Sequence, residues 1–176
     1  PLPEGFSAID YLEPVDERNA RAFGKDMLRD PIRRAAMLEA RDSGAVVLSG
    51  KVTLYQEAVT DVQAGTVLFA PVYREGRPTL TVAQRREALL GWTSAPFRMG
   101  DFLRGTFAAD LRRWDVALYD GGRRAPEALL FDSDPTHPEE EKRSSQLKTV
   151  AVAGRTWTLQ VHPSPEFFLI AGRRQH

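Results

Sequence analysis

The stretch from Asn19 to Arg98 decides the fold of this chain, because most of its recognisable segments fall there. In order, it contains N-A-R-A-F-G-K-D-M (19–27), A-R-D-S-G-A-V-V-L-S (40–49), V-T-L-Y-Q-E (52–57), V-L-F-A-P-V-Y (67–73) and, running one residue further, L-L-G-W-T-S-A-P-F-R-M (89–99). Short apolar runs bounded by turn residues are typical of strands, and they alternate here with segments of helical spacing. The pattern therefore predicts a domain of mixed α and β structure.

The clearest helix of the stretch begins after Asp30. An aspartate can cap a helix start, and Pro31 suits the first helical position. Gly44 stands where a left-handed C-terminal residue is expected. Small and apolar residues recur between these ends at helical spacing, namely Ile32, Ala35, Ala36 and Ala40. The sequence predicts a helix over about 31–42.

Strands are expected around this helix. Residues 6–13 have a strand-like pattern, and a loop is expected from Pro14 to about Arg21. Further strands are predicted over 46–49, 52–56, 66–73 and 89–96, with a polar turn over 58–65. Pro71 places its strand near an edge or a bulge. Thr81 and Gln84 have capping-box spacing and predict a short helix to about Ala88.

The second part of the chain begins with an amphipathic pattern from Met99 to about Leu111 or Arg112, which predicts a helix. Strands over 115–119 and 128–131 then flank D-G-G-R-R, and strands over 148–152 and 155–162 flank A-G-R, so two hairpins are expected. Alternation assigns one inner face to Val150, Val152, Trp157, Leu159 and Val161. Residues 132–145 are interpreted as a mobile surface loop. We expect two small α+β subdomains, over 1–98 and 99–176.

Composition excludes several classes of function. The 176 residues carry 24 basic and 24 acidic side chains, and this balance argues against nucleic acid as the main partner. Cysteine is absent, which removes thiol catalysis, thiolate zinc sites and disulfides. No run approaches the roughly 20 apolar residues of a membrane helix. The chain opens at Pro1 without Met, so we expect a fragment of a longer protein.

Motifs of catalysis are not found. The sequence has no G-x-S-x-G, no glycine-rich phosphate loop and no H-E-x-x-H. His137 falls in the charged loop, His162 ends a predicted strand, and His176 is terminal. We therefore expect no catalytic residue, no metal and no cofactor.

Two charged residues of the deciding stretch leave alternatives open. Asp26, flanked by apolar residues, is interpreted either as a ligand acceptor in an apolar cavity or as a turn cap or ion-pair partner of Arg21 or Arg29. Arg98 is interpreted as an internal ion pair, an anion contact, or a positioning residue at the junction of the two subdomains.

The quoted segments, in this order and spacing, resemble the CHASE domain, the extracytoplasmic sensory domain of receptor histidine kinases and nucleotide cyclases. The resemblance covers roughly residues 6–113. It implies two PAS-like subdomains, preceded by a stalk helix that this chain lacks. It also implies flanking membrane helices outside the fragment, a homodimeric receptor, and a periplasmic or extracellular location for this domain of an inner-membrane protein.

The resemblance also implies a ligand site in the membrane-distal subdomain. Plant receptors of the family hold an adenine-type hormone through a carboxylate and a main-chain group. Alignment places Asp26 on that carboxylate and Leu48 on the main-chain position. Strand alternation nominates Phe69 and Thr93 as further pocket residues.

Three hypotheses of function follow. The first is a small-molecule sensor without catalysis, in which ligand binding shifts the population of two arrangements. The second is a dimerisation or protein-interaction module, which predicts a filled core and an exposed apolar patch. The third, a small hydrolase or transferase, lacks a recognisable nucleophile and base.

Overall fold

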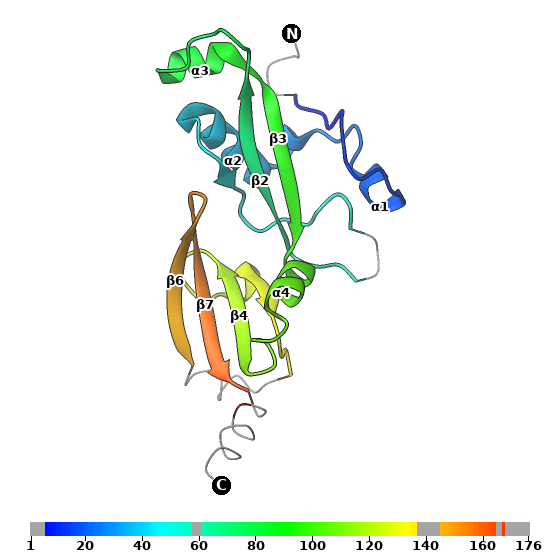
Figure 1. Cartoon of the computed structure of the whole chain (residues 1–176), viewed down its shortest axis with the longest axis vertical. Helices are drawn as coiled ribbons and strands as arrows, with labels where there is room; N and C mark the ends of the chain where they lie inside the picture. Colours follow the sequence, from blue (N-terminus) through cyan, green and yellow to red (C-terminus); the bar gives the residue numbers. More distant parts are fainter. Residues whose placement is uncertain (1–5, 58–60, 137–144, 165–166, 168–176) are drawn as a thin grey trace. The chain divides into compact units, whose positions relative to one another are not determined.

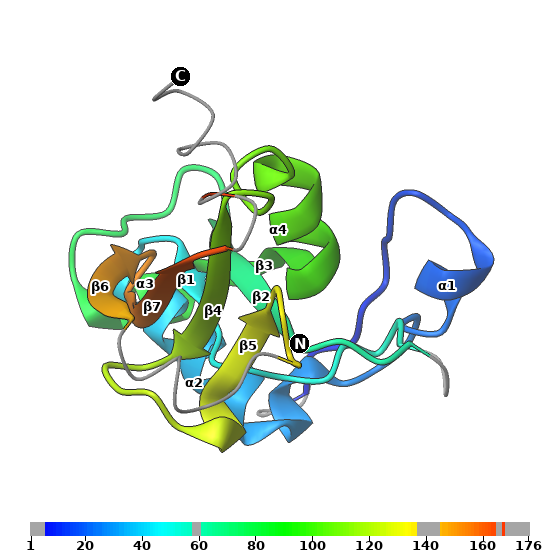
Figure 2. The ribbon, with the colours of Figure 1, turned by 90° about the horizontal axis from the view of Figure 1, so that it is seen from below.

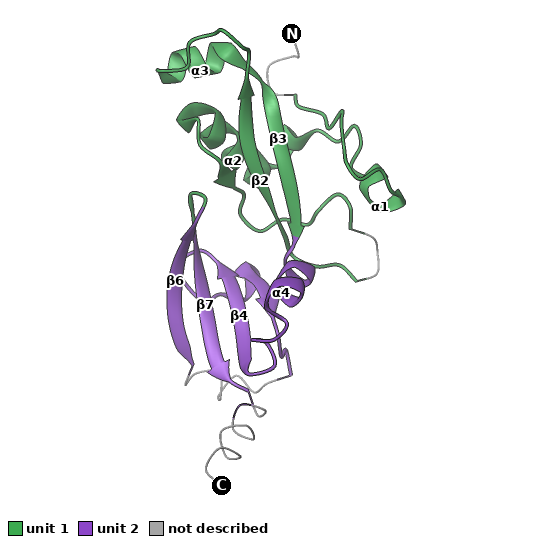
Figure 3. Ribbon diagram, in the orientation of Figure 1, with its two compact units in different colours: residues 1–97, 153–155 green, residues 98–152, 156–176 purple. Residues whose placement is uncertain are grey.

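The structure is a computed structural model that describes residues 6–57, 61–136, 145–164 and 167. The chain divides into two compact units, Pro1–Phe97 with Ala153–Arg155 and Arg98–Val152 with Thr156–His176 (Figure 3). One sheet has three strands, and the other has four. Both sheets are antiparallel and are accompanied by helices, so the expected α+β class is confirmed and is consistent with PAS-like subdomains.

The sheet of the first unit consists of β1 (Val47–Leu48), β2 (Gly65–Tyr73) and β3 (Leu89–Arg98). β1 pairs antiparallel with β2, with Val47 opposite Phe69. β2 is the central strand, and Pro71 lies beyond the two residues that pair with β1. The strands predicted over 66–73 and 89–96 are thus confirmed.

Helix α2 (Pro31–Ser43) packs on β2 (Figure 1). Its start and end are those that the sequence predicts. The Asp30 carboxylate accepts hydrogen bonds from the backbone N–H groups of Ile32 and Arg33, and Gly44 closes the helix with φ 74°. Ala36, Met37 and Ala40 are buried on the side that joins the core with Val67 and Phe69.

Helix α3 (Val82–Ala88) confirms the predicted capping box. Thr81 Oγ1 accepts from the backbone N–H of Gln84, and Gln84 Oε1 accepts from the backbone N–H of Thr81. These two reciprocal bonds satisfy donors that a helix start leaves unpaired.

The N-terminal segment differs from the expectation of a strand over 6–13. It forms one isolated bridge, Ala8 with Asp26, and is otherwise irregular. The helix α1 (Glu17–Ala20) and the 3-10 turn η1 (Met27–Arg29) follow it. The strand prediction was wrong because the segment bonds to the turn at residues 24–27 and not to the edge of a sheet.

The strand predicted over 52–56 was also wrong. Val52 makes an isolated bridge with Gly65, and the chain then turns, with the backbone N–H of Glu57 bonded to the carbonyl of Leu54. Of the predicted turn over 58–65, residues 58–60 lie outside the described residues.

The second unit contains α4 (Met99–Phe107), β4 (Trp114–Asp120), the 3-10 turn η2 (Pro126–Ala128), β5 (Leu129–Asp132), β6 (Gln146–Val152) and β7 (Arg155–Pro163). Figure 2 shows its four strands, which lie in the order β5-β4-β7-β6, with α4 beside the edge of the sheet that β5 forms. The two predicted hairpins are present. α4 ends at Phe107, earlier than expected, and turns bridge the interval to β4.

The predicted inner face of the second hairpin was wrong. Val150 is 44% exposed, whereas Thr158 and Gln160, at the opposite parity of β7, are each 3% exposed. Thr158 Oγ1 donates to the carbonyl of Gly121, and Gln160 exchanges hydrogen bonds with the side chains of Tyr119 and Ser145. Because these partners satisfy the polar groups, the strand can bury them. Most of the expected loop over 132–145, with His137, lies outside the described residues.

Within the described ranges, no helix combines the length and the apolar character needed to cross a membrane.

Candidate functional site

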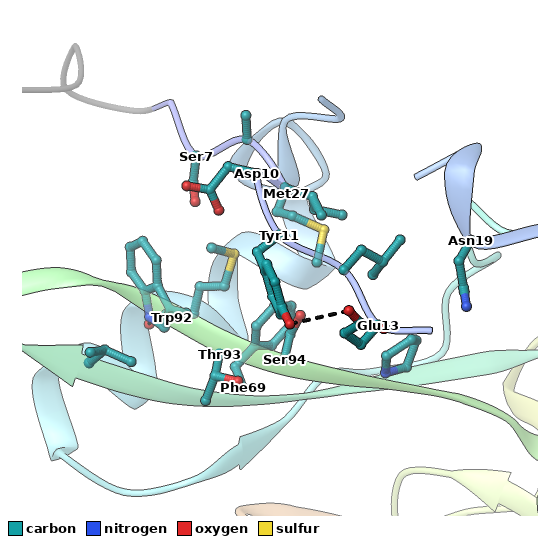
Figure 4. A pocket seen from close by; sticks show the side chains of 16 residues that line it. Ser7, Asp10, Tyr11, Glu13, Asn19, Met27, Phe69, Trp92, Thr93 and Ser94 are labelled. Atoms are coloured by element: carbon teal, nitrogen blue, oxygen red, sulfur yellow. Dashed lines mark hydrogen bonds between the residues drawn. The ribbon is translucent and has the colours of Figure 1, made fainter. Parts of the chain in front are cut away.

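A pocket of about 420 Å³ lies in the first unit (Figure 4). This volume falls within the range of roughly 300–1,000 Å³ that is typical of small-molecule sites. The lining comes from the N-terminal segment, α1, η1, α2, β2 and β3, and it comprises Ser7, Ala8, Ile9, Asp10, Tyr11, Leu12, Glu13, Asn19, Met27, Met37, Phe69, Val72, Trp92, Thr93, Ser94 and Pro96.

The apolar side of the pocket is built from the core of the unit. Phe69 and Met37 are each 1% exposed, so only a small part of each faces the cavity. Met27, in η1, is also buried. The indole Nε1 of Trp92 donates a 2.8 Å hydrogen bond to the carbonyl oxygen of Met37, which fixes the ring against α2. This side is therefore rigid and well packed.

The opposite wall is the N-terminal segment Ser7–Glu13, every residue of which lines the pocket. Backbone hydrogen bonds hold it to the turn before η1. Ile9 bonds to Gly24 and Lys25, and the Met27 N–H donates to the carbonyl of Ser7 at 2.8 Å. No helix or sheet contains this wall, so it is the part of the pocket with the least local support.

The polar groups of the pocket gather on the N-terminal wall. Asp10 and Glu13 are exposed carboxylates, and the phenol of Tyr11 donates to Glu13 Oε1 at 3.3 Å (Figure 4). Asn19 uses its Nδ2 group to donate to the carbonyl of Pro14 and to the Asp16 carboxylate. Thr93 and Ser94 add hydroxyl groups from β3.

A smaller void of about 20 Å³ adjoins the pocket and shares five of its lining residues, Ile9, Leu12, Met27, Ser94 and Pro96. Arg33 lines this void and is 2% exposed. Its guanidinium bonds to Asp30 and to the carbonyl of Thr53, and it lies 4.2 Å from the centre of the Tyr55 ring. Arg33 is thus a charge-paired core residue beside the pocket.

Of the four site residues nominated from the sequence, the structure places Phe69 and Thr93 in the lining of the pocket. Asp26 and Leu48 are not among the lining residues. Leu48 is buried in β1, and its N–H donates to the carbonyl of Ala153. The ligand-binding roles of all four residues stay predictions.

Asp26 has a structural role, whatever its role toward a ligand. Its Oδ1 accepts the backbone N–H of Leu28 at 3.0 Å and that of Ser7 at 3.1 Å. The first bond caps η1, and the second ties the N-terminal segment to it. The cap interpretation of Asp26 is therefore correct. Arg98 forms an ion pair with Asp101, which agrees with the ion-pair interpretation of that residue.

Sequence reasoning missed the N-terminal wall, because it assigned residues 6–13 to a strand. One signal is present in the sequence: residues 8–13, A-I-D-Y-L-E, place two acids and a tyrosine between apolar residues. Among the described residues, no group of three or more histidine, aspartate or glutamate side chains is placed to hold a metal ion.

Comparison with protein-family models gives a match that covers most of the chain. The family model described as the CHASE domain matches residues 3–131. A search among curated proteins finds no match. The matched range begins before the N-terminal wall and includes every described residue that lines the pocket.

Proposed function

Because the chain belongs to the CHASE domain family, whose members are extracellular sensory domains of receptors, we propose that it senses a small molecule in the pocket of its first unit. A sensory domain carries no catalysis of its own. The observation that supports this proposal most directly is the pocket of about 420 Å³, which has a packed apolar side and convergent polar groups.

The construction of the pocket supports a mechanism for the signal. One wall belongs to the core, and the other is the N-terminal segment, held by a few hydrogen bonds to residues 24–27. A ligand that contacts both walls binds best when the segment is closed on the sheet. Binding then shifts the population toward that arrangement, by as much as its affinity for the two states differs.

The parent protein is proposed from the family. We propose a transmembrane receptor, either a histidine kinase or a diguanylate or adenylate cyclase, that works as a homodimer. The domain would lie in the periplasm or outside the cell, and membrane helices outside this sequence would flank it.

A pocket-filling substitution tests the proposal. Ser94 is exposed on β3, lines the pocket and has the same parity along the strand as Trp92, whose indole bonds to α2, so Ser94→Trp places its ring in the pocket. Leu90, which is 61% exposed on the same strand and is not a lining residue, provides the control Leu90→Trp. A small-molecule library is screened by thermal shift, and hits are titrated by calorimetry.

The expected result is at least one compound that binds the unmodified domain and Leu90→Trp equally, and binds Ser94→Trp at least about tenfold more weakly. If no compound binds, and Ser94→Trp leaves signalling by the full receptor unchanged, the pocket has no sensory role. The alternative, a dimerisation or protein-interaction module, would then gain support from a concentration-dependent dimer of the domain.

A further inference from the structure

We propose that the pocket selects an organic cation, an amine or a quaternary ammonium compound, through the carboxylates of Asp10 and Glu13 and the aromatic rings of Tyr11 and Trp92. This inference rests on the proposed function and adds the chemical class of the ligand. It stands on the cavity as a whole, in which an apolar side faces a wall that carries negative charge.

Hydrogen-bond donors are the first feature of the lining that favours a cationic ligand. Three donor groups of the lining are already used inside the protein: the indole N–H of Trp92 bonds to Met37, the phenol of Tyr11 to Glu13, and the amide nitrogen of Asn19 to Pro14 and Asp16. The carboxylates and the Asn19 carbonyl offer acceptors, while hydroxyl groups can serve either way. A ligand that brings donors fits this lining better than one that brings acceptors.

The charge of the lining is a second feature that favours a cationic ligand. Of the sixteen described residues that line the pocket, two are acidic and none is Lys, Arg or His. An ammonium group that approaches either carboxylate forms charge-assisted hydrogen bonds, which are roughly twice as strong as neutral ones. A carboxylate or phosphate ligand would meet repulsion from the same groups.

The nearby guanidinium of Arg33 does not cancel the negative charge of the two carboxylates. Arg33 lines the adjoining void of about 20 Å³, and its charge is compensated by Asp30 at 2.9 Å. Its guanidinium also lies against the Tyr55 ring. The net charge that faces the pocket therefore comes from Asp10 and Glu13.

The aromatic surface of the lining is a third feature that favours a cationic ligand. Tyr11 reaches from the N-terminal segment toward β3, and Trp92 lies on that strand (Figure 4). Because their polar ends are occupied by Glu13 and Met37, both residues offer mainly ring surface to a ligand. Aromatic faces attract cations, Trp most strongly, and cages of such rings recognise quaternary ammonium groups.

Matched pairs of probes test the inference. Choline is compared with dimethylbutanol, its uncharged carbon isostere, and tyramine with ethylphenol, by calorimetric titration of the whole chain. We expect each cation to bind at least about tenfold more tightly than its neutral partner. The advantage of the cations should shrink as the salt concentration rises, because exposed carboxylates are screened.

Variants assign the effect to the proposed residues. Asp10→Asn combined with Glu13→Gln removes both charges at exposed positions and keeps the size of each side chain. It should remove most of the cation's advantage and leave the neutral partner's affinity unchanged. The matched control is Glu17→Gln, because Glu17 is an exposed acid of α1 outside the lining. It should change neither the affinity for the cation nor that for its neutral partner. Tyr11→Leu should weaken the cations alone.

The outcomes separate this inference from the proposed function. Neutral or anionic compounds that bind as tightly as the cations, and are excluded by Ser94→Trp, would overturn the cation inference and leave the sensor function standing. Cation binding that persists in the double variant would also overturn it. If neither probes nor library compounds bind and Ser94→Trp does not change receptor signalling, both proposals fail.

Discussion

The indole Nε1 of Trp92 donates a 2.8 Å hydrogen bond to the backbone carbonyl oxygen of Met37. Trp92 stands on β3, an edge strand, and Met37 is a fully buried residue of α2. One bond therefore joins the edge of the sheet to the helix that packs on it. Both residues line the pocket, so the bond holds two parts of its wall in fixed positions.

Trp92→Phe tests this relationship. The substitution keeps an aromatic ring and removes the donor, so we expect a loss of about 1 kcal/mol in the free energy of unfolding, measured with urea. Trp157→Phe is the matched control, because the Trp157 indole nitrogen is buried and has no hydrogen-bond partner among the residues that the structure describes. Equal losses in the two variants would show that the bond to Met37 contributes nothing.

The Asp26 carboxylate accepts hydrogen bonds from two backbone N–H groups, so two substitutions of this residue should differ in their cost to stability. Asp26→Ala removes the acceptor for Leu28 and Ser7 and should cost about 1 kcal/mol of stability, as other cap losses do. Asp26→Asn keeps an oxygen in place and should cost clearly less. Urea unfolding measures both values.

Hydrogen exchange locates the same effect. In Asp26→Ala the amides of Ser7 and Leu28 lose their acceptor, so their exchange should accelerate more than that of the α2 amides. Uniform acceleration throughout the first unit would contradict a local anchoring role for Asp26.

The elements that the sequence predicts well are those whose ends are determined locally. Asp30, Pro31 and Gly44 define α2 within one stretch of chain, and Thr81 with Gln84 defines the start of α3. Each cap is a contact between residues at most four positions apart. Such contacts leave a direct pattern in the sequence.

The parts of the structure that the sequence did not predict depend on contacts between distant segments. Residues 6–13 have a strand-like composition, but their partner is the turn at residues 24–27, and no local pattern reveals that pairing. Likewise, Thr158 and Gln160 are buried because Gly121, Tyr119 and Ser145 satisfy them, which alternation of hydrophobicity cannot show. For the pocket, alternation indicated Phe69 and Thr93 on the sheet and missed the entire opposite wall.

Two glycines should respond in opposite ways to the same substitution. Gly65 is buried, and a Cβ there would lie 2.5 Å from Cγ of Leu54, itself a buried residue. Gly65→Ala should therefore lower the free energy of unfolding by about 1–3 kcal/mol through overpacking.

Gly105 lies within α4, where an added Cβ would meet none of the described atoms within 4 Å. Gly105→Ala should raise stability by up to about 1 kcal/mol, since alanine favours the helix. Thermal unfolding checks both, and a neutral Gly65→Ala would show that Leu54 has room to move.

Asp42 should make part of the stability depend on pH. Its carboxylate accepts hydrogen bonds from Arg86 and Arg41, which together hold its pKa far below its ordinary value of 3.8. Because the folded state lowers this pKa, the contribution of the ion pairs is complete well above pH 3.8 and is lost as the pH falls toward the folded-state pKa. Asp42→Asn should therefore destabilise the protein by about 1 kcal/mol near neutral pH, and the difference in free energy of unfolding between the variant and the unmodified protein should narrow steadily in acid.

Glu87→Gln is the control, because the Glu87–Arg77 pair is exposed and should contribute little at any pH. Urea unfolding at a series of pH values measures the difference, and a gap that stayed constant or widened in acid would contradict this role for Asp42.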